Sequence, residues 1–256
     1  MKKLLSLLVV IALGIGIINT LDNNAAFPEY GEVNMGTRVA NIFLNKNATE
    51  SNLEVEFGGA DYETGSANYV TSIVANYRSF DTLGEVTVLF ISAFGVALLL
   101  GSKEQRRLEL NFKPNFMLKV GSRALFAIIV MVGLYISIHG HLTPGGGFPG
   151  GTMIAASVLL LYLSNDEFRT KVKGFKMLES VMGVFYVLIG LAGLVLSGFF
   201  LENFLPTGVV GELFSAGIIP VVYIIIGLKV GSEVSSIIDN FLTQEVTKWY
   251  RWQVYY

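Results

Sequence analysis

The central feature of this sequence is the segment His139-Gly-His-Leu-Thr-Pro-Gly-Gly-Gly-Phe-Pro-Gly-Gly151, because apolar sequence lies on both sides of it. The apolar run before it covers residues 124–138, and the run after it covers residues 152–163. At ~1.5 Å per helical residue, neither run alone crosses a hydrocarbon core of ~30 Å. We therefore expect this joint to supply part of the membrane depth as irregular backbone, covered by protein or by a wet cavity.

The composition is that of an integral membrane protein. Of the 256 residues, 52% are hydrophobic and only 15% are charged, and the mean hydropathy is +0.58. Soluble domains carry about 25% charged residues. The chain has no cysteine, which excludes iron–sulfur clusters, disulfides, thiolate metal sites and cysteine nucleophiles. The net charge of −2 gives no indication of nucleic-acid binding.

Six uncharged runs become membrane-spanning helices once their flanking residues are added. They cover residues 4–21, 86–101, 124–138, 152–163, 180–201 and 213–228. We therefore expect an all-α integral membrane protein with six transmembrane helices and a broken glycine-rich joint between the third and the fourth. The first run also fits a signal peptide, because Lys2 and Lys3 precede it and Ala25 and Ala26 follow it.

Lysine and arginine are distributed unequally between the two sides of the membrane. If the N-terminus is inside, fifteen lysines and arginines fall in inner segments, and Lys229 is one of the fifteen. Only Arg38, Lys46 and Arg78 fall in outer segments. Basic residues are enriched on the cytoplasmic side of membrane proteins. This asymmetry predicts that both termini are cytoplasmic.

The long outer segment, residues 22–78, has a helical pattern only near its end. We expect Ser66 to cap a helix that carries an apolar stripe. The stripe consists of Val70, Ile73, Val74 and Tyr77.

Asp81 and Glu85 are four residues apart, so they share one face of a helix at the outer end of the second span. Two carboxylates at that spacing repel, and each raises the pKa of the other unless a cation or Arg78 lies between them. Two interpretations remain open. The pair is either a solvated helix start, with Asp81 complementing the helix dipole, or a pair that handles ions or bridges subunits.

The two histidines of the chain, His139 and His141, are a poor chelating pair, because their spacing places them on opposite sides of a helix. We therefore expect no metal site. A histidine at the membrane edge can exchange protons near neutral pH. The alternative is that the rings hold the joint through hydrogen bonds. The glycines do not form a phosphate loop, since no Gly-Lys-Ser/Thr follows, and close backbone packing explains them better.

The fifth and sixth spans carry small residues and shallow acids. Gly183, Gly190 and Ser197 are spaced seven apart and are predicted to form a helix-packing seam. Glu179 precedes Gly183 by one turn, and Glu212 is expected one turn inside the sixth span. For both acids an interfacial role and an ion-handling role remain open.

Two further expectations concern the membrane interior. Pro220 is expected to kink the sixth span. No ionisable residue falls in the middle of any of the six runs, although such residues mark proton relays and carrier sites. We therefore expect that the chain is not a complete pump or carrier by itself.

The joint closely resembles the signature of the MnhB-type subunit of Mrp-type multisubunit Na⁺/H⁺ antiporters, and the four spans from about Arg123 onward resemble that subunit's layout. The stretch Tyr77-Arg-Ser-Phe-Asp-Thr-Leu-Gly-Glu85 resembles the C-terminal tail of the largest subunit of these antiporters, except that Ser79 replaces a glycine. The resemblance thus implies a tail-like two-helix region at residues 1–110 and a four-helix MnhB-like domain at residues 111–256. A similar joining of Mrp parts occurs in archaeal membrane-bound hydrogenases and sulfane reductases.

The resemblance implies a multi-pass component of a cation-translocating module in the prokaryotic cell (inner) membrane. Its partners would be antiporter-like and small Mrp-type subunits, with a hydrogenase-like peripheral arm. Na⁺ and H⁺ would be the transported ions. This chain would bind no cofactor and catalyse nothing by itself, and the redox cofactors of an oxidoreductase-linked complex would lie on partner subunits.

Roles are implied only at matched positions. Asp81 and Glu85 match the acidic pair of the large-subunit tail, which is implicated in the cation path, whereas Glu179 and Glu212 match no motif. The residues that match the MnhB signature are His139, His141, Thr143, Pro144, Gly145, Gly146, Gly147, Gly150 and Gly151.

Three functions compete at this point. The chain could help to form a cation conduit between partners. It could instead be a structural subunit that docks a redox arm to antiporter-like subunits. The third function, a stand-alone transporter, conflicts with the lack of ionisable groups in the six runs.

Overall fold

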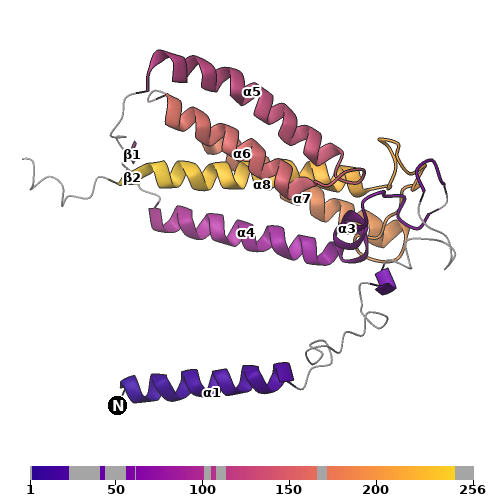
Figure 1. The fold of residues 1–256 in the computed structure, drawn as a ribbon, viewed down its shortest axis with the longest axis horizontal. Coiled ribbons are helices and arrows are strands. Elements are labelled where there is room, and N and C mark those ends of the chain that lie inside the picture. Colours follow the sequence, from indigo (N-terminus) through magenta and orange to yellow (C-terminus); the bar gives the residue numbers. More distant parts are fainter. Residues whose placement is uncertain are drawn as a thin grey trace, which may run out of the picture. The chain divides into compact units, whose positions relative to one another are not determined.

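The computed structural model describes residues 2–22, 41–43, 56–60, 62–100, 105–107, 114–165 and 172–245. They fall into two units, residues 1–46 and residues 47–256. The first unit contributes helix α1 (Lys2–Asp22), which contains the apolar stretch Leu7–Leu21. The second unit contains the other labelled helices and strands of Figure 1 and is described below by itself.

The second unit is a bundle of long helices. In chain order they are α4 (Ser79–Leu100), α5 (Phe116–Ile138), α6 (Gly147–Ser164), α7 (Val172–Leu196) and α8 (Ile219–Leu242). Among the described residues, these five helices are long and apolar enough to cross a membrane. The short helix α3 (Tyr69–Thr71) and the π-helix η1 (Ser72–Tyr77) precede α4.

Two three-residue strands mark one end of this bundle. Strand β1 (Gln105–Arg107) follows α4 and pairs antiparallel with β2 (Thr243–Glu245), which follows α8, with Arg106 opposite Gln244. We call this the strand end. The opposite end, which contains the turn at residues 139–146, is called the joint end.

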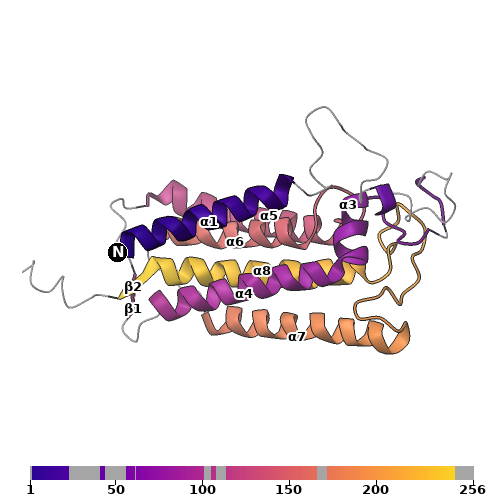
Figure 2. The same ribbon diagram turned by 90° about the horizontal axis from the view of Figure 1, so that it is seen from below.

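Helix α8 is the centre of the bundle. It packs against α4, α5, α6 and α7, and Figures 1 and 2 show it between the α5–α6 pair and helices α4 and α7. Of the most apolar stretch of each helix, 67% is buried in α8 but only 11% in α4 and 17% in α5. Protein therefore surrounds α8, which lets it carry polar groups that a lipid-facing helix could not.

Small residues bring α5, α6 and α8 together. A Cβ atom on Gly150 of α6 would collide with the Ser137 hydroxyl of α5 and lie 2.5 Å from the Gly133 carbonyl oxygen. A Cβ atom on Gly151 would lie 2.7 Å from the Gly227 carbonyl oxygen of α8. Only glycine fits at these two crossings.

The joint is shorter than the sequence predicted. Helix α6 begins at Gly147, so residues 147–151 form its first turn, and only residues 139–146 lie outside the helices. Residues 147–151 thus lengthen α6, whereas the irregular backbone expected for part of the joint is confined to residues 139–146. Helix α5 has 23 residues, which is about 34 Å at the usual rise, so it crosses without help from the joint.

The last long helix also has different bounds. It covers Ile219–Leu242, whereas the sixth uncharged run in the sequence covers residues 213–228. The run ended there because Lys229 is the first charged residue after it. Pro220 lies in the first turn, where its missing N–H would have no intrahelical partner in any case, so the expected kink was wrong.

The start of the helix before α4 differs as well. Asn68, not Ser66, is the N-cap of α3, and its side-chain oxygen accepts hydrogen bonds from Val70 N at 3.1 Å and Thr71 N at 3.4 Å. The helix then continues as the π-helix η1 instead of a regular α-helix.

Candidate functional site

The most deeply buried acid that the structure describes, Glu233, forms an ion pair with Lys229 within α8. Lys229 Nζ donates to Glu233 Oε1 one turn later, and the two side chains are 7% and 0% exposed. Lys229 lies ten residues after the first residue of α8, or about 15 Å along the helix, near its middle. Two charges at that depth cost several kcal/mol each unless they are paired.

A second acid, Glu179 of α7, lies beside this pair. It is only 8% exposed and interacts electrostatically with both Lys229 and Glu233. Glu179 is seven residues from the strand end of α7, and Glu233 is nine residues from the strand end of α8, so the two acids lie at similar depth. We call Glu179, Lys229 and Glu233 the buried charge cluster.

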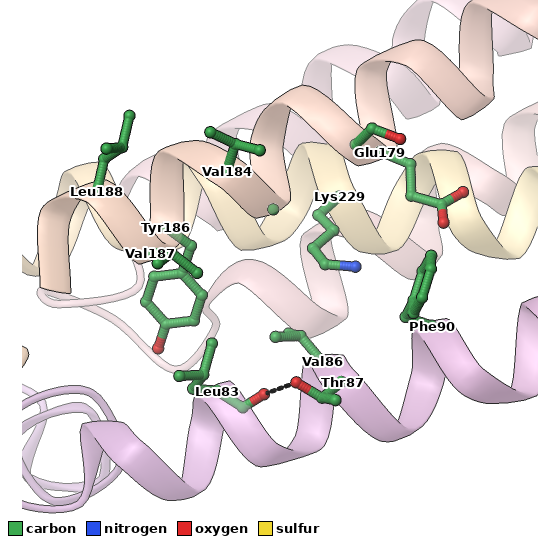
Figure 3. A pocket seen from close by; sticks show the side chains of 12 residues that line it. Leu83, Val86, Thr87, Phe90, Glu179, Val184, Tyr186, Val187, Leu188 and Lys229 are labelled. Carbon is green, nitrogen blue, oxygen red and sulfur yellow. Dashed lines mark hydrogen bonds between the residues drawn. The ribbon is translucent and has the colours of Figure 1, made fainter. Parts of the chain in front are cut away.

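The cluster borders a cavity of about 430 Å³ between α4, α7 and α8. Figure 3 shows Lys229 extending from α8 toward α4 and Glu179 entering the same space from α7. Lys229 Nζ lies 5.4 Å from the ring centroid of Phe90, a cation–π contact that stabilises the ammonium away from water. The other walls are mainly apolar, with hydroxyls from Thr87 and Ser180.

The prediction that no ionisable group lies in the middle of a span was therefore wrong. Lys229 and Glu233 are separated by one helical turn, so each neutralises the other and the helix continues through both. Because the sixth apolar run was ended at Leu228, Lys229 and Glu233 were counted outside the span. The signal that could have found the pair is a lysine followed four residues later by an acid, both within apolar sequence.

Helix α8 remains polar and buried beyond the pair. Tyr162 of α6 donates its hydroxyl hydrogen to Asp239 Oδ1, and both side chains are almost fully buried. The other buried polar residues in this half of α8 are Ser232, Ser235, Ser236 and Asn240. This stretch links the cluster to the strand end of the bundle.

Asp81 and Glu85 lie in the first two turns of α4, at the joint end. Arg78 donates from Nε to Asp81 Oδ2 at 2.5 Å, and both side chains are more than half exposed, at 58% and 51%. A pair this exposed contributes at most about 1 kcal/mol. Glu85 is also exposed, so neither acid belongs to the buried charge cluster.

His139 stacks on an aromatic ring at the end of α5. Its ring centroid lies 4.1 Å from that of Tyr135, and its Nδ1 lies 3.0 Å from the Tyr135 carbonyl oxygen. The ring is thus held against the last turn of the helix.

His141 is fully buried, with an exposed fraction of 0%. Its Nε2 lies 3.4 Å from the backbone carbonyl oxygen of Glu212, whereas Nδ1 has no hydrogen-bond partner among the described residues. Burial lowers the pKa of His141, and the carbonyl of Glu212 opposes that shift only in part. Burial therefore favours the neutral form of His141.

Glu212 is not inside a span. It lies in a turn before α8, and its side chain is exposed. Only its backbone carbonyl reaches the joint.

Residues 66–71, which precede α4, cover carbonyl groups of the joint. Thr71 donates to Gly140 O at 2.7 Å, Asn68 donates to the oxygens of Gly140 and Thr143 at 3.0 Å each, and Ser66 donates to His141 O at 2.8 Å. Tyr223 of α8 donates to the Thr71 hydroxyl at 3.0 Å. The carbonyl oxygens of Gly140, His141 and Thr143 are thus satisfied by protein from the same chain.

The remaining joint residues close the turn. Gly145 lies near the Ile136 carbonyl, where an added Cβ would come within 3.0 Å, and Gly146 has a φ of 128°, which favours glycine. Gly147 packs on Ile226 of α8, and Pro144 is exposed. These residues shape the turn and contribute no ionisable group.

The three small residues that were predicted to form a packing seam on α7 have different surroundings within this chain. Gly183 faces Lys229, with 3.6 Å between an added Cβ and Lys229 Cε, whereas Gly190 packs against the ring of Phe200 in the following loop. Ser197 lies just beyond the end of α7 and is exposed.

Of the six acids and histidines predicted as site residues, only Glu179 lies in the buried charge cluster. Asp81, Glu85, His139, His141 and Glu212 lie toward the joint end. Among the described residues, no group of three or more histidine, aspartate or glutamate side chains is placed to hold a metal ion.

Two family models match this chain. The model described as "Domain related to MnhB subunit of Na+/H+ antiporter" matches residues 117–236, which include α5 to α8 up to Ser236. The model of the MbhE family, which describes one of the subunits of MBH, matches residues 30–107.

A relative and a chain of a solved complex are similar to this protein over most of its length. The uncharacterized protein MJ1307 of Methanocaldococcus jannaschii is 31% identical over 191 residues, which are 64% of this chain and 72% of that protein. A chain in the solved membrane-bound sulfane sulfur reductase, described as an archaeal respiratory membrane complex, is 39% identical with a TM-score of 0.72. That match covers 95% of this chain and 99% of the other.

A more distant likeness concerns the fold alone. The solved Mrp complex of Dietzia sp. DQ12-45-1b contains a chain with 22% identity and a TM-score of 0.64. The match covers 96% of this chain but only 26% of that longer chain. The same helical arrangement therefore occurs both as a separate chain and within a larger one.

Proposed function

Because this chain belongs to the family of MnhB-type membrane subunits, which are found in Mrp antiporters and in the Mrp-derived membrane-bound sulfane reductase complex, we propose that it forms part of a cation path. It is a multi-pass membrane protein with other membrane subunits as partners. Its role in the assembly is that of a non-redox subunit of the cation-translocating module. The redox chemistry of a respiratory assembly belongs to other subunits in this proposal.

The observation that carries this proposal is the buried charge cluster. Ionisable groups at membrane depth are expensive, and they are typical of ion and proton paths. Lys229 and Glu233 lie on the most buried helix, and Glu179 faces the cavity beside them. A component that served only as a scaffold would not need charges there, since apolar residues of similar volume pack at least as stably.

The proposed topology has six spans, with α1 as the first and both termini in the cytoplasm of a prokaryotic cell. The positive-inside rule supports it, because fourteen lysines and arginines remain on the inner side after Lys229 is assigned to α8, against three outside. The strand end is then the cytoplasmic end, and the joint end is the outer end.

The proposed division of the chain is a region at residues 1–110 and an MnhB-like domain at residues 111–256. The two family models support it by matching on either side of that boundary. The proposed partners are antiporter-like and small Mrp-type subunits, and the proposed cargo ions are Na⁺ and H⁺. The likeness to the sulfane sulfur reductase chain favours a respiratory host complex, and co-purification with a redox arm tests this.

Asp81 and Glu85 are proposed to act at the outer mouth of the path, where Arg78 holds Asp81 in place. In the assembled complex, Asp81→Asn or Glu85→Gln should reduce Na⁺-dependent transport without loss of subunits. Full transport in both variants would exclude this role for the two acids.

The main experiment replaces both members of the buried pair, Lys229→Met with Glu233→Met, in the complete assembly. The double variant leaves no unpaired charge within α8, so we expect the complex to assemble, as checked on a native gel. Na⁺-dependent proton movement in reconstituted vesicles should then fall to a small fraction of the wild-type rate.

The matched control is Glu202→Gln, which removes an exposed acid from the loop after α7. This variant should transport at the wild-type rate. If the double variant assembles and also transports at full rate, the cation-path function is wrong and a docking role for this chain takes its place.

A further inference from the structure

We propose that the buried charge cluster holds one exchangeable monovalent cation, which is either a proton on Glu179 or an alkali cation in its place. The inference rests on the proposed function and names the ligand of the same site. It follows from the number of charges that the structure buries together.

The cluster contains two acids and one base. Lys229 is in direct contact with Glu233, so these two side chains neutralise each other. Glu179 then carries a negative charge that no second base within the cluster balances. At 8% exposure in an apolar setting, an uncompensated carboxylate is costly, so one further positive charge must accompany it.

Other charged groups near the cluster do not supply that charge within the cavity. Lys176 interacts electrostatically with Glu179 but is exposed one turn closer to the strand end of α7. Glu85 of α4 is an acid and is exposed, and Asp239 is held by Tyr162 on the α6 side of α8. The exposed ammonium of Lys176 is screened by water and headgroups, whereas the proposed cation lies inside.

The position of the exchangeable cation follows from the two acids' surroundings. Glu233 is 0% exposed and does not line the cavity, whereas Glu179 does. The hydroxyls of Thr87 and Ser180 line the same cavity. Each donates its hydrogen to its own helix, to Leu83 O and Lys176 O, and keeps oxygen lone pairs that can accept a cation.

The second oxygen of Glu233 is a further acceptor. Oε2 is buried and has no hydrogen-bond partner among the described residues. A buried acceptor of this kind usually has a bound partner, such as a water molecule.

The exchange step is balanced in charge. When an alkali cation enters, the proton leaves Glu179 and the net charge of the cluster with its cation stays at zero. When the cation leaves, a proton returns to the carboxylate. Lys229 stays paired with Glu233 and faces the Phe90 ring in both states, so the exchange concerns Glu179 alone.

The test uses dicyclohexylcarbodiimide, a hydrophobic reagent that modifies protonated carboxyl groups in apolar surroundings. The whole complex in its native membranes is treated with the reagent in N-methylglucamine, sodium or potassium buffer, and adducts on this chain are located by mass spectrometry. We expect an adduct on Glu179 that falls roughly tenfold once a protecting cation exceeds its half-protecting concentration about tenfold, as one-site binding requires. The sodium and potassium arms show which cation binds.

Two variants complete the experiment. Glu179→Gln should abolish the cation-protected adduct without creating one on Glu233, and Glu202→Gln should leave the adduct on Glu179 unchanged. Infrared difference spectra of the purified complex provide a second measurement, in which added cation should remove a protonated-carboxyl band in wild type but not in Glu179→Gln.

The inference is overturned if the Glu179 adduct forms equally in all three buffers, or if it appears on Glu233 instead. It is also overturned if neither the adduct nor the infrared band occurs at Glu179. These failures differ from failure of the proposed function, since transport could still require Lys229 and Glu233 when no cation protects Glu179.

Discussion

At the scale of single residues, the structure separates positions that shape the fold from positions that carry charge. The joint glycines belong to the first kind, because each lies against backbone or a neighbouring helix. His141 is different, since it is buried, ionisable and in contact with the loop before α8. Both kinds of residue lead to measurable expectations.

Gly150→Ala should destabilise the complex by about 1–3 kcal/mol, because the added methyl group collides with Ser137 and Gly133 of α5. The measurement is the thermal unfolding midpoint of the purified assembly. The control is Gly121→Ala in α5, where no atom of the described chain lies within 4 Å of an added Cβ. An equal midpoint for the two variants would contradict the close crossing of α5 and α6.

His141 should make stability dependent on pH. Burial lowers its pKa, so the unfolded chain takes up a proton at a higher pH than the folded chain does. Its contribution is fully present above about pH 6.5, the usual histidine pKa, and it is lost as the pH falls below that value. We expect His141→Gln to show a smaller decrease in thermal midpoint between about pH 7.5 and about pH 5.5 than wild type does. An unchanged decrease would show that His141 does not titrate on unfolding.

At the scale of elements, α8 explains why this bundle can hold charge. A helix in contact with four others has little surface toward lipid, so its polar residues meet protein on every side. Helices α4 and α7 have broad exposed apolar faces, which suit lipid or the transmembrane helices of partner subunits. The charged groups lie where protein excludes lipid, as the cost of burying charge requires.

The ion pair of α8 can be tested by a double-mutant cycle. Lys229→Met alone leaves Glu233 buried without its partner and should cost about 3–5 kcal/mol, as should Glu233→Met alone. The double variant should recover most of that loss, because no unpaired charge remains. Thermal midpoints of the four complexes give the coupling energy, and additive losses in the double variant would argue against a direct pair.

At the scale of the whole molecule, the lack of cysteine makes the topology testable with few changes. Single cysteines are introduced at Ala25, Ser102 and Glu202, and the intact complex is treated with a membrane-impermeant thiol reagent. We expect labelling of Ala25→Cys and Glu202→Cys from outside the cell, and of Ser102→Cys only in inverted vesicles. Adducts are read on this chain by mass, since partner subunits carry their own cysteines. If Ala25→Cys is labelled from the inner side, α1 does not cross the membrane with its N-terminus inside.

The sequence alone determined the class of this protein. Long apolar runs and few charges indicate membrane helices because lipid cannot hydrogen-bond to backbone, and the joint motif was sufficient to indicate the MnhB type. Local patterns also placed Glu179 one turn before Gly183, although only as a shallow acid of the fifth span.

Only the tertiary structure decided which residues meet. A run of apolar letters ends at the first charge, whereas a helix continues when that charge has a partner one turn away, as Lys229 does in Glu233. Glu179 is many residues away from that pair in the sequence, and Asn68 is many residues away from the joint that it covers. No local pattern therefore reveals either interaction. The cost of burying a charge depends on everything packed around it, and packing is a property of the folded chain.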